Sequence, residues 1–197
     1  MPQMDAPELI LASTSPYRRQ LLDRLRTPYL ALAPGVEESQ APGEAPGGRA
    51  ARLAGLKAEA VARLHPAAAV IGSDQVASCR GRVLDKPGDA ARCQEQLAWL
   101  SGQQAEFHTA FTVLCKARGF RRDGTDRTVV QFRTLTSEEI GRYIALERPF
   151  DCAGGFKCEA LGITLFERLD SSDPTALIGL PLIALAAALR PLGFTLP

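Results

Sequence analysis

The sequence contains no long apolar run and no segment that would direct it to a membrane. No stretch of about 18 consecutive apolar residues occurs among its 197 residues, so no segment is long enough to span a bilayer as a helix. The first seven residues, Met-Pro-Gln-Met-Asp-Ala-Pro, lack the basic and apolar regions of a signal peptide. These absences argue against an integral membrane protein and lead us to expect a cytoplasmic one.

The chain also lacks an excess of charge of one sign and is poor in histidine. Its 23 Lys and Arg residues nearly balance 22 Asp and Glu residues, which removes the general electrostatic basis for binding nucleic acid or an anionic membrane. With two histidines and five cysteines that form no C-x-x-C pair, we expect reduced thiols and no structural zinc. The glycines form neither G-x-x-x-x-G-K-[ST] nor G-x-G-x-x-G, which excludes a P-loop and a dinucleotide-binding fold.

Apolar segments typical of strands alternate with helical patterns along most of the chain. The predicted strands, in chain order, lie at 9–12, 27–34, 69–74, 106–115, 127–135 and 162–168. Helices are predicted from Pro16, at 49–64, at 90–100, at 137–147, and from Gly179-Leu180-Pro181 to just before Pro191. A hairpin turn is expected at Asp123-Gly124. This order predicts an α/β fold, with a mixed twisted sheet flanked by helices. We expect a single domain over 9–197 after an N-terminal extension of residues 1–8.

The segment Ser13-Thr14-Ser15-Pro16-Tyr17-Arg18-Arg19 joins the first predicted strand to the first helix. Ser15 is a good N-cap and Pro16 suits the first helical position, so the free N–H groups and the positive end of the helix dipole lie at this turn. Two arginines in the first turn are unfavourable there unless an anion is bound. We predict a polyphosphate site formed by Ser13, Ser15, Arg18 and Arg19. The alternative is an ordinary capped helix with solvated arginines.

A second polar segment, Ser73-Asp74-Gln75, follows the apolar run at 69–72. Ligands of α/β proteins bind beyond the carboxyl ends of the strands. Asp74 is therefore the best candidate for a general base, a role that partial desolvation favours. The alternative is an Asp that caps a turn at the end of a strand.

Two lysines and an acidic pair complete the candidate site. Lys57 lies on the apolar face of the helix at 49–64, so its ammonium either reaches out to water or points into a ligand cleft. Lys86 precedes Pro87 in a turn. With the two arginines, these lysines balance a triphosphate of about four negative charges. Either Glu37 or Glu38 is a candidate ligand for a divalent ion, and a solvated acidic pair is the alternative.

Several short motifs together resemble the Maf family of nucleoside triphosphate pyrophosphatases. They are Ser13-x-Ser15-Pro16-x-Arg18-Arg19, Gly72-Ser73-Asp74-Gln75-Val76, Lys86-Pro87, Ser101-Gly102 and Gly179-Leu180-Pro181. The resemblance runs from Leu9 to Gly193 and implies a Maf/ITPase-like fold with two lobes and a substrate cleft between them. It implies hydrolysis between the α- and β-phosphates of a nucleotide, with Mg²⁺ or Mn²⁺ as cofactor. It also implies Asp74 as proton acceptor and metal ligand, Lys57 and Lys86 as catalytic cations, and a homodimer.

Two features resemble the YceF-type branch of that family, the 7-methyl-GTP pyrophosphatases. One is Gln75 directly after Asp74, and the other is the segment Cys152-Ala153-Gly154-Gly155-Phe156-Lys157-Cys158-Glu159. The resemblance implies that Tyr17, Gln75 and Glu159 select the base. This chain departs from the branch pattern at Tyr17 (Trp expected), Asp85 (Gly), Gly155 and Cys158 (both Ser) and Ala160 (Gly).

Two other functions compete with this interpretation. One is a pyrophosphatase of broader range, or one that prefers the pyrimidine nucleotides dTTP and UTP. The other is a nucleotide-binding regulator of septum formation, a role the family resemblance also suggests. The combination of Asp74 with Lys57 and Lys86 favours an enzyme, because a protein that only binds needs no base.

Overall fold

The computed structural model describes residues 5–197, which form two compact units. Unit 1 comprises residues 5–75, 109–126 and 173–197, and unit 2 comprises 76–108 and 127–172. The chain therefore passes between the units at 75/76, 108/109, 126/127 and 172/173, and each unit is described by itself below. Residues 1–4 of the predicted N-terminal extension lie outside the described residues.

The predicted α/β class is confirmed. Across residues 5–197 the strands are β1 (Leu9–Ala12), β2 (Leu30–Leu32), β3 (Ala69–Cys79), β4 (Arg82–Leu84), β5 (Gln104–Cys115), β6 (Phe120–Phe132) and β7 (Phe166–Asp170). They form a mixed sheet in the order β2-β1-β3-β5-β6-β7, with β4 paired to β3. The helices are α1 (Pro16–Asp23), α2 (Pro46–Leu64), α3 (Ala90–Leu100), α4 (Ser137–Glu147) and α5 (Leu182–Leu189). None of the helices described is both long and apolar enough to cross a membrane.

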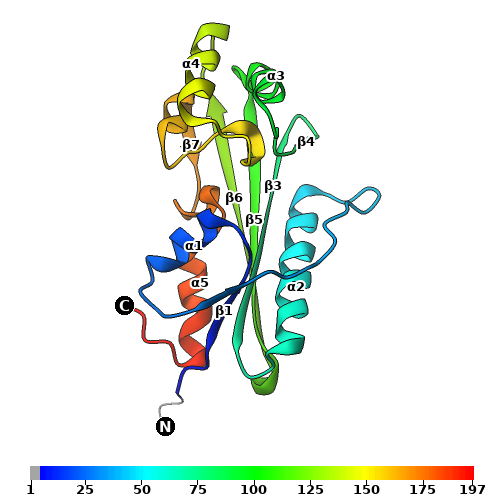
Figure 1. Ribbon diagram of the computed structural model, residues 1–197, viewed down its shortest axis with the longest axis vertical. Coiled ribbons are helices and arrows are strands. Elements are labelled where there is room, and N and C mark those ends of the chain that lie inside the picture. Colours follow the sequence, from blue (N-terminus) through cyan, green and yellow to red (C-terminus); the bar gives the residue numbers. More distant parts are fainter. Residues whose placement is uncertain (1–4) are drawn as a thin grey trace. The chain divides into compact units, whose positions relative to one another are not determined.

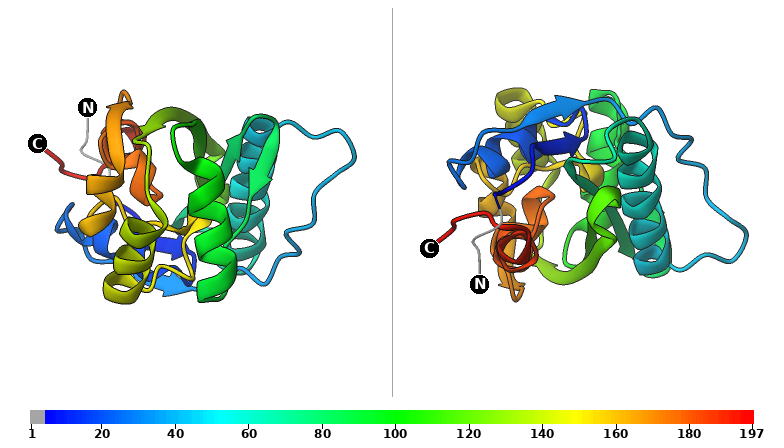
Figure 2. Two further views of the ribbon diagram at one scale, coloured as in Figure 1. Left: turned by 90° about the horizontal axis from the view of Figure 1, so that it is seen from above. Right: turned by 90° about the horizontal axis from the view of Figure 1, so that it is seen from below.

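In unit 1, helices cover both faces of the strands. Helices α1 and α5 lie on one face and α2 on the other (Figure 1 and Figure 2). Successive residues of a strand point to opposite faces, so Leu9 and Leu11 of β1 pack in the core with α1 and α5. Ile10 and Ala12 pack in the core with α2. The same alternation along β3 decides which residues of the candidate site share a face.

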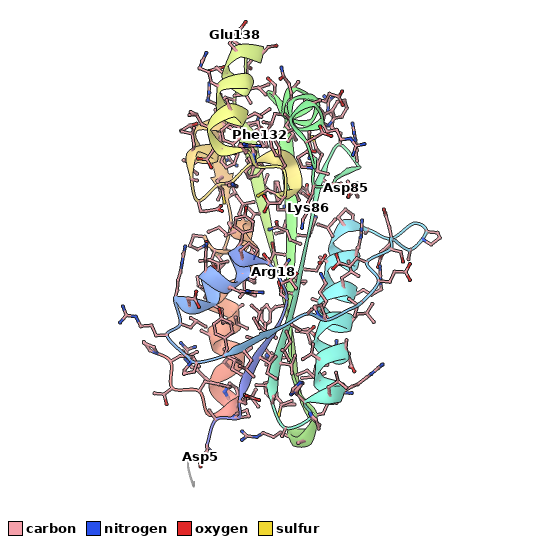
Figure 3. The ribbon with its side chains drawn as sticks, viewed as in Figure 1. Asp5, Arg18, Asp85, Lys86, Phe132 and Glu138 are labelled. Carbon is pink, nitrogen blue, oxygen red and sulfur yellow. The ribbon has the colours of Figure 1, made fainter. Side chains whose placement is uncertain are left out.

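Unit 2 is built around helices α3 and α4, which pack together, and a cluster of four aromatic rings. Phe156 lies edge-on to its three neighbours, with ring centroids 5.4, 5.6 and 5.0 Å from those of Phe107, Phe132 and Phe166. Phe132, labelled in Figure 3, ends β6. Edge-to-face packing of this kind is favourable, and it anchors the segment that carries Glu159.

Several predicted boundaries were wrong, among them one helix start, one hairpin turn and one strand start. Helix α2 begins at Pro46 rather than residue 49, because proline is accommodated in the first turn of a helix. The turn between β5 and β6 lies at 116–119, where Gly119 has a φ of 59°, and Gly124 is a residue of β6 packed against the Phe111 ring. The predicted strand at 162–168 starts only at Phe166, after a 3-10 helix, η3 (Leu161–Leu165).

Candidate active site

The residues of the predicted site on β3 divide between its two faces. Gly72 and Asp74 share the face of Val70, which packs in the core with α2. Ser73 and Gln75 share the opposite face with Ile71. Asp74 does not end the strand as predicted, because β3 continues to Cys79 and its last three residues pair with β4.

Gly72 allows α2 to approach β3 closely. A Cβ atom at this position would overlap the carbonyl oxygen of Ala54 and would lie 2.5 Å from the nitrogen of Ala58. Only a residue without a side chain fits against the helix backbone at this distance. Lys57 belongs to the turn of α2 that makes this contact, so the close approach brings its side chain to Asp74.

Lys57 forms ion pairs with two carboxylates. Its Nζ lies 2.6 Å from Oδ1 of Asp74 and 2.7 Å from Oε1 of Glu38. Lys57 and Asp74 are 5% and 6% exposed, so the ammonium does not reach out to water, and Asp74 lies inside β3 rather than at a turn after it. An ammonium has three protons to donate, so one remains for a phosphate oxygen. Oδ2 of Asp74 forms no hydrogen bond within residues 5–197.

The structure brings Glu38 rather than Glu37 to the site. Both residues are exposed, but the carboxylate of Glu38 pairs with Lys57. Two arginines of α2 hold the chain around Glu38, because Arg49 donates to the carbonyl of Glu38 at 3.1 Å and Arg52 to that of Ser39 at 3.0 Å. Arg52 also forms two hydrogen bonds with Glu44, which lower the pKa of that carboxyl to about 2.

Arg18 extends from α1 toward the strands of unit 1 (Figure 3). Its Nε donates to the carbonyl oxygen of Gly179 at 3.0 Å, and Nη1 lies 3.5 Å from Oγ of Ser13. Burial lowers the pKa of Arg18, while the nearby negative charges of Asp74 and Glu38 oppose that shift. The guanidinium and the Lys57 ammonium therefore belong to one charged cluster in unit 1.

The turn before α1 has the predicted N-cap. Oγ of Ser15 accepts from the backbone N–H of Arg18 at 3.4 Å, and Oγ of Ser13 accepts from the backbone N–H of Ser15 at 3.2 Å. Both hydroxyls act as acceptors, which leaves their protons for an anion. Arg19 is exposed, whereas Tyr17 and Arg18 are partly buried on α1.

Gln75 makes its contacts inside unit 1 through its amide nitrogen. Nε2 lies 2.9 Å from Oγ1 of Thr109 and 3.0 Å from the carbonyl oxygens of Ala176 and Leu177. Thr109 is fully buried and donates to the carbonyl of Ala176 at 2.9 Å. Thr109 was not predicted, because nothing in a strand pattern marks a threonine that bonds to a turn 67 residues away.

Lys86 and Glu159 belong to unit 2. Lys86 is exposed in the segment after β4, next to Asp85 (Figure 3). Glu159 is exposed between two 3-10 helices, η2 (Ala153–Gly155) and η3, and its Oε2 lies 3.6 Å from Sγ of Cys158. Burial, with the charge of Glu159, raises the pKa of the Cys158 thiol to about 12. The thiol therefore remains protonated at neutral pH beside the carboxylate.

Two carboxylates of unit 1 are suited to share a divalent cation. Glu38 and Asp74 both bind the Lys57 ammonium, so their oxygens lie close together. Residues 5–197 contain no group of three or more His, Cys, Asp or Glu side chains that could hold a metal. Mg²⁺ is usually bound by one or two carboxylates together with substrate phosphates and water. Two carboxylates fit a cation that binds together with a polyphosphate.

Comparisons with known proteins give a consistent result. A family model described as "Maf-like protein" matches residues 8–192. The chain is 52% identical over 184 residues to the 7-methyl-GTP pyrophosphatase of Ralstonia nicotianae, covering 93% of this chain and 95% of that protein. It is 54% identical over 191 residues to the protein of the same name from Xanthomonas oryzae pv. oryzae, covering 97% and 100%. Among solved structures, the Staphylococcus aureus Ham1 protein has a TM-score of 0.46 and 15% identity over 64% of this chain and 72% of that one, which is too low to add to the assignment.

Proposed function

Since the chain belongs to the Maf family, we propose that it is a nucleoside triphosphate pyrophosphatase whose substrate is 7-methyl-GTP. Two relatives that bear the name 7-methyl-GTP pyrophosphatase match it at 52% and 54% identity over nearly their whole length. The products are 7-methyl-GMP and diphosphate. As part of the same proposal, the enzyme acts in the cytoplasm and takes a nucleotide, not a nucleic acid, as its partner.

The buried ion pair between Lys57 and Asp74 is the observation that carries this proposal. Oδ1 of Asp74 is held by the ammonium at 2.6 Å, whereas Oδ2 is left to accept a proton from water. As that proton moves to Asp74, the water oxygen forms a bond to phosphorus and the anhydride bond between the α- and β-phosphates breaks. General-base assistance of this kind typically contributes about 10²–10⁴-fold to a rate.

The cations of unit 1 serve the phosphates in this mechanism. Arg18 and Lys57 offset the negative charge that a triphosphate carries and that shifts to the leaving diphosphate. Ser13 and Ser15 add hydroxyl donors at the N-terminus of α1, where the helix dipole also favours an anion. Glu38 and Asp74 would hold the divalent cation, which supplies further charge neutralisation at the phosphate oxygens when bound. Lys86 is proposed as a further catalytic cation.

The base is proposed to be selected by Tyr17, Gln75 and Glu159. The 7-methylguanine ring carries a positive charge, so an aromatic face gains about 0.5–2 kcal/mol from a cation–π contact. A carboxylate such as that of Glu159 accepts from the N1–H and N2–H edge of guanine and also balances the charge of the methylated ring. A pyrimidine would leave those acceptors unpaired, which is how a polar site discriminates between substrates.

A panel of nucleotides tests the proposal. Hydrolysis of 7-methyl-GTP, GTP, dTTP and UTP with Mg²⁺ or Mn²⁺ is followed by the release of diphosphate and of orthophosphate. We expect diphosphate and a preference for 7-methyl-GTP. Better hydrolysis of dTTP or UTP would contradict 7-methyl-GTP as the substrate but not the pyrophosphatase activity. Binding of nucleotides without hydrolysis would leave only the alternative of a nucleotide-binding regulator.

Two variants test the selection of the base. Glu159→Gln keeps the size of the side chain and removes its charge, so we expect activity on 7-methyl-GTP to fall more than activity on GTP. Tyr17→Ala should show the same difference, because stacking on a cation is what the ring adds. Equal losses on both nucleotides would contradict a role of these residues in recognising the methylated base.

A further inference from the structure

The proposed mechanism gives the Gly179-Leu180-Pro181 motif no role, although Gly179 forms a hydrogen bond with Arg18. The carbonyl oxygen of Gly179 accepts from Nε of Arg18 at 3.0 Å and from Oγ of Ser73 at 3.1 Å. Gly179 has a φ of 131°, a conformation that residues with a side chain rarely adopt. The backbone at this glycine is thus set so that one carbonyl receives both donors.

Hydrogen bonds join the turn that precedes Gly179 to β3 and β5. It is the 3-10 turn η4 (Ala176–Ile178), which packs against α1. Gln75 donates to the carbonyls of Ala176 and Leu177, and Thr109 donates to the carbonyl of Ala176. Because Thr109 is fully buried, water cannot replace its hydroxyl as the donor to this carbonyl.

A second set of bonds fixes the far side of the same segment. Oγ1 of Thr175 accepts from the N–H of Leu182 at 2.9 Å and lies 2.8 Å from the carbonyl oxygen of Leu180. Asp173 accepts from the N–H and the hydroxyl of Thr175 through Oδ1 and from the N–H of Ile183 through Oδ2. The segment from 173 to 183 is therefore held at both ends, and the carbonyl of Gly179 lies between them.

We propose that Thr109 and Gln75 are positioning residues that orient the Arg18 guanidinium through η4 and the carbonyl of Gly179. A guanidinium whose Nε–H is held by a fixed carbonyl presents its remaining N–H groups in a defined direction. The inference rests on the proposed function, in which Arg18 binds the phosphates. It gives Gln75 a role at the phosphate end of the substrate in addition to its proposed role in base selection, so its loss should lower activity on every nucleotide.

Thr109→Val and Thr109→Ser form the first test. Valine keeps the shape and removes the hydroxyl, whereas serine keeps the hydroxyl. We expect Thr109→Val to weaken binding of inorganic tripolyphosphate by about 10-fold and to lower kcat/KM by a similar factor on 7-methyl-GTP and GTP, because a misplaced group costs up to about 10²-fold. Thr109→Ser should restore most of both losses. The resonance of the Arg18 Nε–H, assigned by its disappearance in Arg18→Lys, should shift in the valine variant only.

Thr112→Val is the matched control on the same strand. Thr112 is as buried as Thr109, but its hydroxyl bonds to Asp123. The same substitution there should lower thermal stability without changing tripolyphosphate binding or the Arg18 resonance. Equal effects of the two valine variants on binding would overturn the inference and mean that Thr109 serves only the stability of unit 1.

A double-mutant cycle with Arg18→Ala tests whether Thr109 acts through Arg18. If it does, Thr109→Val should have almost no further effect on tripolyphosphate binding when Arg18 is already absent. Additive losses would overturn the inference. Tripolyphosphate binding does not require hydrolysis, so a wild-type protein that binds tripolyphosphate but hydrolyses no nucleotide would contradict the proposed function alone.

Discussion

The two faces of β3 carry different chemistry although their residues alternate along four positions of one strand. On the α2 side, Asp74 takes part in a buried ion pair with Lys57, which Glu38 extends. On the other side, Ser73 and Gln75 make neutral hydrogen bonds to backbone carbonyls. The first face holds charges that can react, and the second holds the backbone that orients Arg18.

The difference predicts different responses to mutation. Removing one partner of a buried ion pair leaves a charge without compensation, which costs about 3–5 kcal/mol. Removing one of several neutral hydrogen bonds costs about 0.5–1.5 kcal/mol. Substitutions on the α2 side of β3 should therefore lower the free energy of unfolding more than substitutions on the opposite side.

Asp74→Asn should have the largest effect on the rate. Asparagine keeps the shape of the side chain and a hydrogen-bond acceptor for Lys57, but it cannot take a proton from water. We expect kcat to fall by about 10²–10⁴-fold, while binding of the nucleotide survives. Steady-state kinetics and calorimetric titration measure the two quantities. Near-normal hydrolysis would remove Asp74 from the mechanism and leave its ion pair a purely structural one.

Lys57→Met should have the largest effect on stability. Methionine has a similar volume and no charge, so the Asp74 carboxylate remains buried without its partner. We expect the free energy of unfolding in urea to fall by about 3–5 kcal/mol, with weaker turnover of the triphosphate. Adding Asp74→Asn should recover part of that stability, because the uncompensated charge is then gone. A loss below about 0.5 kcal/mol would indicate that the ion pair is not buried in solution.

Gly72→Ala tests the contact that brings the charged face together. A methyl group there overlaps the backbone of α2, and overpacking of this kind costs about 1–3 kcal/mol. The helix must move away from β3, so Lys57 and Asp74 should separate and kcat should fall as well. Gly141→Ala is the control, since Gly141 lies in α4 with open space around its Cβ position. It should stabilise the protein by up to about 1 kcal/mol and leave kcat unchanged.

Local patterns were enough to predict much of unit 1 and the N-cap of α1. The strand at 9–12 and the cap at Ser15 both appear as expected, because each depends on residues at most three positions apart. The position of Lys57 on a buried helix face also followed from helical periodicity. Whether its ammonium reaches water or a ligand cleft was left open, and the ion pair with Asp74 was not predicted.

The features that could not be predicted depend on contacts between distant residues. The Asp123-Gly124 pair carries the sequence signal of a turn, but Gly124 packs against Phe111 inside β6 and the chain turns earlier at Gly119. The hydrogen bond between Arg18 and Gly179 joins residues 161 positions apart. No local pattern marks such a contact, and so Gly179 was recognised as part of a motif without a role.

Ser73→Ala should have the smallest effect and completes the comparison of the two faces. Ser73 is fully buried, and its hydroxyl donates to the carbonyl of Gly179. That carbonyl still accepts from Arg18 in the variant, so no buried acceptor is left without a partner. We expect the free energy of unfolding to fall by about 0.5–1.5 kcal/mol and kcat/KM to change by less than that of Lys57→Met. A loss of stability as large as that of Lys57→Met would mean that the neutral face is as sensitive as the charged one, because the carbonyl of Gly179 would then depend on Ser73 rather than on Arg18.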